Sequence, residues 1–280
     1  MSSKKKRNSK KGKTLIMETI AGFIIIILIL LWLLGSKLMG GGKTVYKIEP
    51  RESNISTVKL SDDSGFDTIG WLRVQGTGID YPIIQAVDDV EKDFPVELES
   101  FVWSLNYDNI YHNRIRVSGH NIFNLSSHPE LHSDLFTRFE ELMDFVYYDF
   151  AKENQHIQLT MDGKDYIYKI FMVGFVPSTE KSMFPMGDDY SSKDMKTYLD
   201  IFKKYNFYDY DIDVSNDDHI ITLSTCTRFY GINKDVELYV LGRRLRDGEE
   251  ATSYSVSTTD VYKEIENILK GDENDEENDM

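Results

Sequence analysis

The hydrophobic pattern predicts a domain built mainly from short β-strands between residues 66 and 247. Apolar and β-branched residues alternate in short runs, which is typical of half-buried strands. These runs cover residues 69–74, 79–85, 101–105, 115–118, 156–161, 166–176, 219–226 and 236–241. Glycine turns separate the first two runs and the pair within 156–176, as expected for hairpins. Such strands, with helices in the connections, predict a mainly β barrel or sandwich with the helices on its outside.

Three stretches repeat apolar residues every three or four positions, which is the period of an amphipathic helix. Residues 134–150 predict one helix or a pair of helices, and residues 191–205 predict another with lysines opposite its apolar face. The latter lies in a long connection, residues 177–218, and connections of this length often cover a site. Near the C-terminus, residues 259–270 predict a short helix that ends at Gly271.

The start of the chain predicts a membrane anchor with its N-terminus in the cytoplasm. Residues 1–13 contain seven basic residues and no acidic one, and residues 15–34 are apolar except near their start. A helix of that length reaches about 30 Å, the thickness of a bilayer core. The basic flank stays in the cytoplasm, so we expect the remainder outside the cell. A cleavable signal peptide is the alternative, but residues 36–39 lack the Ala-x-Ala pattern that ends one.

Charge narrows the expected partners. The chain carries a formal charge of −15 at pH 7, and residues 1–34 contribute +6, which leaves −21 on the remainder. A domain this acidic does not offer the broad basic surface that nucleic acid or an anionic membrane surface requires. We therefore expect no nucleic-acid partner.

Composition divides the chain into five segments. A run of three glycines after the apolar stretch indicates a tether, and the last ten residues contain six acids and no base, which indicates a disordered tail. The predicted segments are a basic cytoplasmic tail (1–14), a transmembrane signal anchor (15–34), a linker with N-terminal helices (35–65), the mainly β domain (66–247), and an extension with a short helix and an acidic disordered tail (248–280).

Cys226 is the only cysteine of 280 residues, and it ends the predicted strand 219–226 where a loop begins. Because one cysteine cannot form an internal disulfide, this thiol is either a small buried apolar group or a chemically active one. A strand end suits an active group, since the strand fixes its geometry and the loop admits substrate. A thiol that attacks an amide also needs a proton donor and a cationic or N–H-lined place for the oxyanion.

His120 is the best candidate for the proton donor among six histidines. It follows the predicted strand 115–118 at a glycine, the same kind of position that Cys226 occupies. His219 lies on the strand of Cys226, about 23 Å from it, and cannot reach the sulfur. The other four are interpreted as loop histidines without a chemical role: His112, His128, His132 and His156.

Three motifs resemble the class B sortases of Gram-positive bacteria. They are GWLRVQGTGIDYPIIQ at residues 70–85, Ser-Gly-His-Asn at residues 118–121, and TLSTCT at residues 222–227. The motifs occur in the order found in that family, and the resemblance covers residues 66–246. The long helical connection before the cysteine strand and the N-terminal anchor also resemble that class.

The resemblance implies a sortase-type closed β-barrel of about eight strands, with N-terminal helices and a helix in the long loop before the cysteine strand. It implies a membrane-anchored cysteine transpeptidase that cleaves the sorting signal of a surface protein, holds the protein as a thioester, and transfers it to an amino group of a peptidoglycan precursor or a pilin. Cys226 is then the nucleophile and His120 the general acid and base, while Ser224, Thr225 and Asn121 contact the substrate. No metal ion or organic cofactor is implied.

The chain departs from the family on the last strand, where the family has an arginine that steadies the oxyanion and the substrate. The matching position is Glu237, and a carboxylate there opposes the developing oxyanion. Arg243 lies about 20 Å further along the strand, which is too far for its side chain to span. We interpret Arg228, two residues after Cys226, either as the replacement or as a solvated loop arginine.

Two further hypotheses stay open. The presence of Glu237 supports a catalytically impaired sortase-fold protein that binds a sorting signal or a pilin as a scaffold. A hydrolytic cysteine protease of the cell surface uses the same residues and differs only in the acceptor, because it passes the cleaved protein to water.

Overall fold

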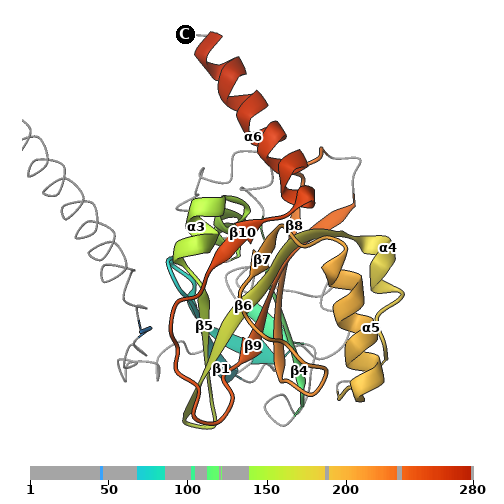
Figure 1. The fold of residues 1–280 in the computed structure, drawn as a ribbon. Helices are drawn as coiled ribbons and strands as arrows, with labels where there is room; N and C mark the ends of the chain where they lie inside the picture. Colours follow the sequence, from blue (N-terminus) through green and yellow to red (C-terminus); the bar gives the residue numbers. More distant parts are fainter. Residues whose placement is uncertain are drawn as a thin grey trace, which may run out of the picture. The chain divides into compact units, whose positions relative to one another are not determined.

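The computed structural model in Figure 1 describes residues 45–46, 68–85, 102–104, 112–119, 121, 139–186, 189–231 and 235–278. The chain divides into two compact units, Met1–Thr44 and Val45–Met280, and every described residue belongs to the second. Among the described residues, no helix combines the length and the apolar character that crossing a bilayer requires. The predicted anchor, residues 15–34, lies outside the described residues, as do the predicted N-terminal helices apart from residues 45 and 46.

Eight strands of the described part form a closed barrel, which confirms the predicted fold class. In order around the barrel they are β1 (Thr68–Val74), β2 (Asp80–Gln85), β3 (Val102–Ser104), β4 (Arg114–Gly119), β8 (Ile220–Thr227), β9 (Val236–Arg244), β6 (Lys164–Pro177) and β5 (His156–Met161). Strand β5 pairs with β1 and closes the ring. Strands β4 and β8 pair in parallel, so their C-terminal ends meet at the same end of the barrel.

Strand β8 separates two apolar clusters. Ile221 and Leu223 belong to the cluster that fills the barrel. Successive side chains of a strand point to opposite faces, so the residues between them face outward. On this outer face the Thr222 hydroxyl lies 2.8 Å from the hydroxyl of Tyr198, which belongs to a covering helix. The side chains of β8 therefore pack into the barrel core on one face of the strand and against a helix on the other.

That covering helix is α5 (Ser192–Lys203), as the apolar period predicts (Figure 1). The Ser191 hydroxyl caps it by accepting a hydrogen bond of 3.2 Å from the Asp194 N–H. Its buried residues Met195, Tyr198 and Phe202 share the outer cluster with residues of β8 and β9. A single turn, α4 (Ser178–Lys181), precedes it at the end of β6 and was not predicted, because four residues are too few to show a period.

The amphipathic stretch at residues 134–150 is a pair of helices where the structure describes it. A 3-10 helix, η4 (Glu140–Val146), is followed by α3 (Tyr148–Glu153). Tyr147 separates them because its backbone is extended, with φ −84° and ψ 126°. Of the two predicted alternatives, the pair is therefore the correct one.

The C-terminal segment contributes a strand and a helix. β10 (Val256–Thr258) pairs with β7 (Tyr208–Tyr210) in a separate two-stranded sheet, and α6 (Asp260–Asn278) follows. The helix continues through Gly271, so the predicted end at that glycine is wrong, and it takes in residues 271–278 of the predicted tail. A glycine inside a helix costs only about 1 kcal/mol relative to alanine, so it does not by itself stop one. The α6 residues of the barrel core cluster are Tyr262, Ile265 and Leu269.

We expect Ile265→Val to lower the free energy of unfolding by about 1 kcal/mol, since Ile265 is fully buried and the change leaves a small cavity. Ile268→Val is the matched control, because Ile268 is only partly buried on the same helix and should lose less than half as much. Urea unfolding followed by circular dichroism measures both. Equal losses for the two variants would contradict the packing of α6 on the core.

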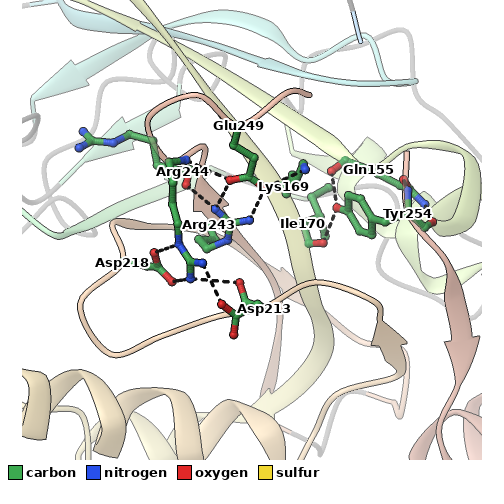
Figure 2. Close-up of polar contacts among 10 residues, drawn as sticks. Gln155, Lys169, Ile170, Asp213, Asp218, Arg243, Arg244, Glu249 and Tyr254 are labelled. Atoms are coloured by element: carbon green, nitrogen blue, oxygen red, sulfur yellow. Dashed lines mark hydrogen bonds and ion pairs between the residues drawn. The ribbon is translucent and has the colours of Figure 1, made fainter. Parts of the chain in front are cut away.

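An ionic cluster of Glu249, Arg243 and Lys169 joins the segment that follows β9 to the barrel strands β9 and β6 (Figure 2). The Nη1 and Nη2 atoms of Arg243 lie 2.6 and 2.7 Å from the two carboxylate oxygens of Glu249, and Lys169 Nζ lies 2.8 Å from Oε1. The Arg243 and Lys169 side chains are only 3% and 9% exposed. Hydrogen bonds, above all from Arg243, hold the pKa of Glu249 well below its usual range. Further along, the Tyr254 hydroxyl donates to the Gln155 carbonyl at 2.8 Å.

Candidate active site

The Cys226 thiol is exposed near the C-terminal end of β8. Its neighbours Thr225 and Thr227 are buried, so the strand alternation turns the cysteine away from the barrel interior. Strand β9 pairs with β8 along its whole length, and β4 pairs with it up to Ser224. The thiol is therefore accessible on a firmly held backbone, which contradicts the alternative of a small buried apolar group.

The end of β4 lies against this end of β8. The Thr225 hydroxyl donates a hydrogen bond of 2.7 Å to the Gly119 carbonyl, and the Asn121 amide donates one of 3.1 Å to the Cys226 carbonyl. Gly119 and Asn121 precede and follow His120 in the sequence, so residues on both sides of that histidine contact residues 225 and 226. His120 itself lies outside the described residues, and its role stays a prediction.

Ser224, Thr225 and Asn121 are the predicted substrate contacts. In the structure their side chains bond to the protein itself: the Ser224 hydroxyl lies 2.8 Å from that of Ser118, and the other two bond to backbone carbonyls across the strand pair. Thr225 and Asn121 are 3% and 4% exposed. These residues hold the ends of β4 and β8 together, and a contact with substrate stays a prediction.

Glu237 of β9 is the cross-strand partner of Cys226. The Lys181 ammonium forms an ion pair with its Oε1, and the Tyr239 hydroxyl donates a hydrogen bond of 2.8 Å to its Oε2. Burial, reinforced by the Glu237 carboxylate, raises the pKa of Tyr239 far above its usual value, so the phenol keeps its proton and donates. The carboxylate opposite the thiol is thus offset by an ammonium and a hydroxyl group.

Sequence reasoning missed Lys181. It ends the single turn α4 in a polar stretch, so no pattern singles it out. It reaches the site because β6 pairs with β9, with Val176 opposite Glu237, and α4 begins where that pairing ends. The Ser178 N–H then donates a hydrogen bond of 3.0 Å to the Asp235 carbonyl just before β9. Lys181 could be identified only from the register between β6 and β9, two strands that lie far apart in the sequence.

Arg228 is exposed in the turn that follows β8. The Gly231 N–H donates a hydrogen bond of 2.6 Å to its carbonyl, and Gly231 has φ +91°, a left-handed conformation that glycine adopts without strain. The Phe229 N–H donates one of 3.1 Å to the Thr227 hydroxyl. These bonds define the backbone of the turn, and the substitution of Arg228 for the family arginine stays a prediction.

Aromatic packing anchors the same turn. Phe229 is buried, and its ring centroid lies 4.9 Å from that of Phe175 on β6. The Tyr230 ring lies 5.6 Å from the same phenylalanine. Burial raises the pKa of Tyr230, and the Glu264 carboxylate of α6 adds to the shift. The turn beside the thiol therefore packs on β6 and lies near α6.

The three histidines that the structure describes lie at the end of the barrel opposite Cys226. His112 and His219 come just before β4 and β8, and the His219 Nδ1 lies 3.1 Å from the His112 carbonyl. His156 begins β5 and pairs with Lys169 of β6, which pairs with Arg243 of β9, the partner of Ile220 at the start of β8. His156 therefore lies at the same end of the barrel. Burial lowers its pKa to about 4. None of the three can reach the thiol. The remaining two, His128 and His132, lie outside the described residues.

The surroundings of Cys226 suit nucleophilic chemistry on a substrate that approaches from solvent. The backbone is rigid, the thiol is accessible, and an ammonium group pairs with the residue opposite. Within the described residues, no group of three or more His, Cys, Asp or Glu side chains is placed to hold a metal ion.

The sequence is similar to that of one characterised sortase, although it matches no protein-family model. It is 28% identical to Sortase B of Staphylococcus aureus (strain NCTC 8325 / PS 47) over 167 residues, which cover 59% of this chain and 65% of the relative. The alignment thus spans less than two thirds of that relative's length.

The fold is similar to two crystal structures of sortase B from Clostridium perfringens. One gives a TM-score of 0.52 at 23% identity and covers 64% of this chain and 94% of the other. The second, a cysteine-to-serine mutant form, gives 0.51 at 21% identity and covers 64% and 82%. The resemblance to class B sortases that the motifs predict is therefore confirmed, and the barrel that carries Cys226 is a sortase B fold.

Proposed function

We propose that this chain is a membrane-anchored cysteine transpeptidase of the class B sortase type, with Cys226 as its nucleophile. The observation that carries the proposal is the placement of the only thiol, exposed near the end of a barrel strand and beside the end of β4 that leads to His120. The similarity to Sortase B of Staphylococcus aureus supports the reaction class.

In the proposed reaction the Cys226 sulfur attacks the carbonyl carbon of an amide in a sorting signal. A carbon–sulfur bond forms, the amide carbon–nitrogen bond breaks, and the leaving amine takes a proton from His120. An amino group of a peptidoglycan precursor or a pilin then attacks the thioester. The new amide forms, the Cys226 sulfur leaves as the thiolate, and His120 takes up the proton of the incoming amine, which restores the thiolate and the imidazolium with which the cycle began.

The proposal places the catalytic domain outside the cell. Support comes from the seven basic residues that precede the apolar residues 15–34, since such a flank stays in the cytoplasm. Surface proteins and cell-wall amines are then on the same side of the membrane as Cys226.

The proposal is tested with the full chain in a mild detergent, incubated with Leu-Pro-x-Thr-Gly and Asn-Pro-x-Thr-x peptides. We expect the mass of the protein to rise by that of the acyl fragment, hydroxylamine to reverse the rise, and added triglycine to give a new amide product. Equal release of free acid with and without triglycine would instead identify a protease.

One observation favours a second function, a scaffold that binds sorting signals without cleaving them. Glu237 lies directly opposite Cys226, where its carboxylate opposes negative charge on the sulfur or the oxyanion. Saturable binding of the peptide, with no change in the mass of the protein, would support the scaffold and contradict the transpeptidase.

A further inference from the structure

The ion pair of Lys181 and Glu237 lies beside the thiol. As cross-strand partners, Cys226 and Glu237 have Cβ atoms about 4.5 to 5.5 Å apart and side chains on the same face. Lys181 contacts the end of the Glu237 side chain, so one side chain separates its ammonium from the residue opposite the sulfur. Near the surface of a protein, a unit charge at such a separation still changes the ionisation of a thiol.

The ammonium is the more accessible member of the pair. The Lys181 side chain is 32% exposed, whereas that of Glu237 is 15% exposed and also accepts the hydrogen bond from Tyr239. The Glu237 carboxylate therefore has two polar partners, Lys181 and Tyr239, whereas part of the Lys181 side chain faces solvent. The cation is therefore the member of the pair that is more exposed to solvent.

The segment that carries Lys181 is held in place before any substrate arrives. The Ser178 hydroxyl donates a hydrogen bond of 2.7 Å to the Asp235 carboxylate, which fixes the start of α4 to the start of β9. The Tyr205 hydroxyl donates one of 3.0 Å to Glu180 from the chain that follows α5. Charges that are already in position at a reacting centre need no reorganisation when negative charge develops.

We infer that Lys181, positioned by Glu237, supplies the positive charge that stabilises negative charge at Cys226. It acts first on the thiolate and then, if the proposed function holds, on the oxyanion of the tetrahedral intermediate. Lys181 acts through its charge and transfers no proton, and Glu237 is a positioning residue. The second step rests on the proposed function, whereas the first concerns the thiol alone.

The test measures the rate at which iodoacetamide alkylates the full chain in detergent, where Cys226 is the only thiol. We expect Lys181→Ala to slow alkylation at pH 7 about threefold to tenfold and to raise the pH at which the rate is half maximal. Lys181→Arg keeps the charge and should retain the wild-type rate. The exchanged pair Lys181→Glu with Glu237→Lys keeps a cation beside the sulfur and should also retain it.

Lys204→Ala is the matched control, because Lys204 pairs with Glu180 at 3.8 Å in the same region and its side chain is 56% exposed. Its alkylation rate should equal that of the wild type. Thermal unfolding of each variant separates a charge effect from a loss of structure. A wild-type rate and pH profile for folded Lys181→Ala would overturn the inference, and so would a loss in Arg228→Ala without one in Lys181→Ala.

Failure of this inference differs from failure of the proposed function. Alkylation requires no peptide, so a slowed Lys181→Ala supports the charge on the thiol even where no peptide forms a thioester. Conversely, a wild-type chain that forms the thioester, together with unchanged alkylation in Lys181→Ala, supports the transpeptidase and overturns the role of Lys181.

Discussion

Replacing Cys226 by alanine is expected to abolish the thioester and to lower the rate of transfer at least about 1,000-fold. Alanine has no electron pair with which to form the acyl-enzyme, and the other groups of the site cannot replace that step. Because Cys226 is exposed, the truncation removes no core contact and the melting temperature should not change. Mass spectrometry of the protein after incubation with a sorting-signal peptide measures the thioester.

Ser182→Ala is the control for the cysteine variant. Ser182 is an exposed small residue at the end of α4, and its hydroxyl donates a hydrogen bond of 2.9 Å to the Thr179 carbonyl of the same turn. We expect wild-type rates from it. Full transfer by Cys226→Ser would contradict the thiol mechanism, because a serine hydroxyl is a far weaker nucleophile at neutral pH than a cysteine thiol.

The second large effect is expected from Glu249→Gln, which should lower the free energy of unfolding by about 3 to 5 kcal/mol at pH 7. The substitution leaves two buried cations, Arg243 and Lys169, without the carboxylate that both contact (Figure 2). Glu250→Gln is the matched control, since the neighbouring Glu250 is exposed and its loss should be below about 0.5 kcal/mol. Urea unfolding measures both variants.

The same comparison predicts a dependence on pH. The folded protein holds the pKa of Glu249 well below its usual value, so the carboxylate stabilises the fold fully above the unfolded pKa, which is about 4.3. As pH falls through that value, the unfolded chain takes up a proton first and the stabilisation declines. The difference between the wild type and Glu249→Gln should therefore shrink from pH 6 to pH 3. A constant difference would contradict the ionic cluster.

Local pattern was sufficient for most of the barrel. The run at residues 219–226 became β8 (Ile220–Thr227), and the period at residues 191–205 became α5 (Ser192–Lys203). Of the elements of three or four residues, β3 lies within the predicted run 101–105, whereas β7, β10 and α4 were not predicted. Those three are too short to show a period and form only where a partner or a strand end supports them.

For the site, the sequence by itself predicted which thiol is the candidate nucleophile and on which strand it lies. A single cysteine at the end of a predicted strand identifies the thiol, and the end of β4 beside it agrees with the position expected for the Gly119–Asn121 segment. Only the tertiary structure decided which charged groups surround that thiol. The β8–β9 register sets Glu237 opposite Cys226, and the β6–β9 register brings Lys181 to Glu237. Register between strands that are distant in sequence depends on how whole faces pack, and no local period contains it.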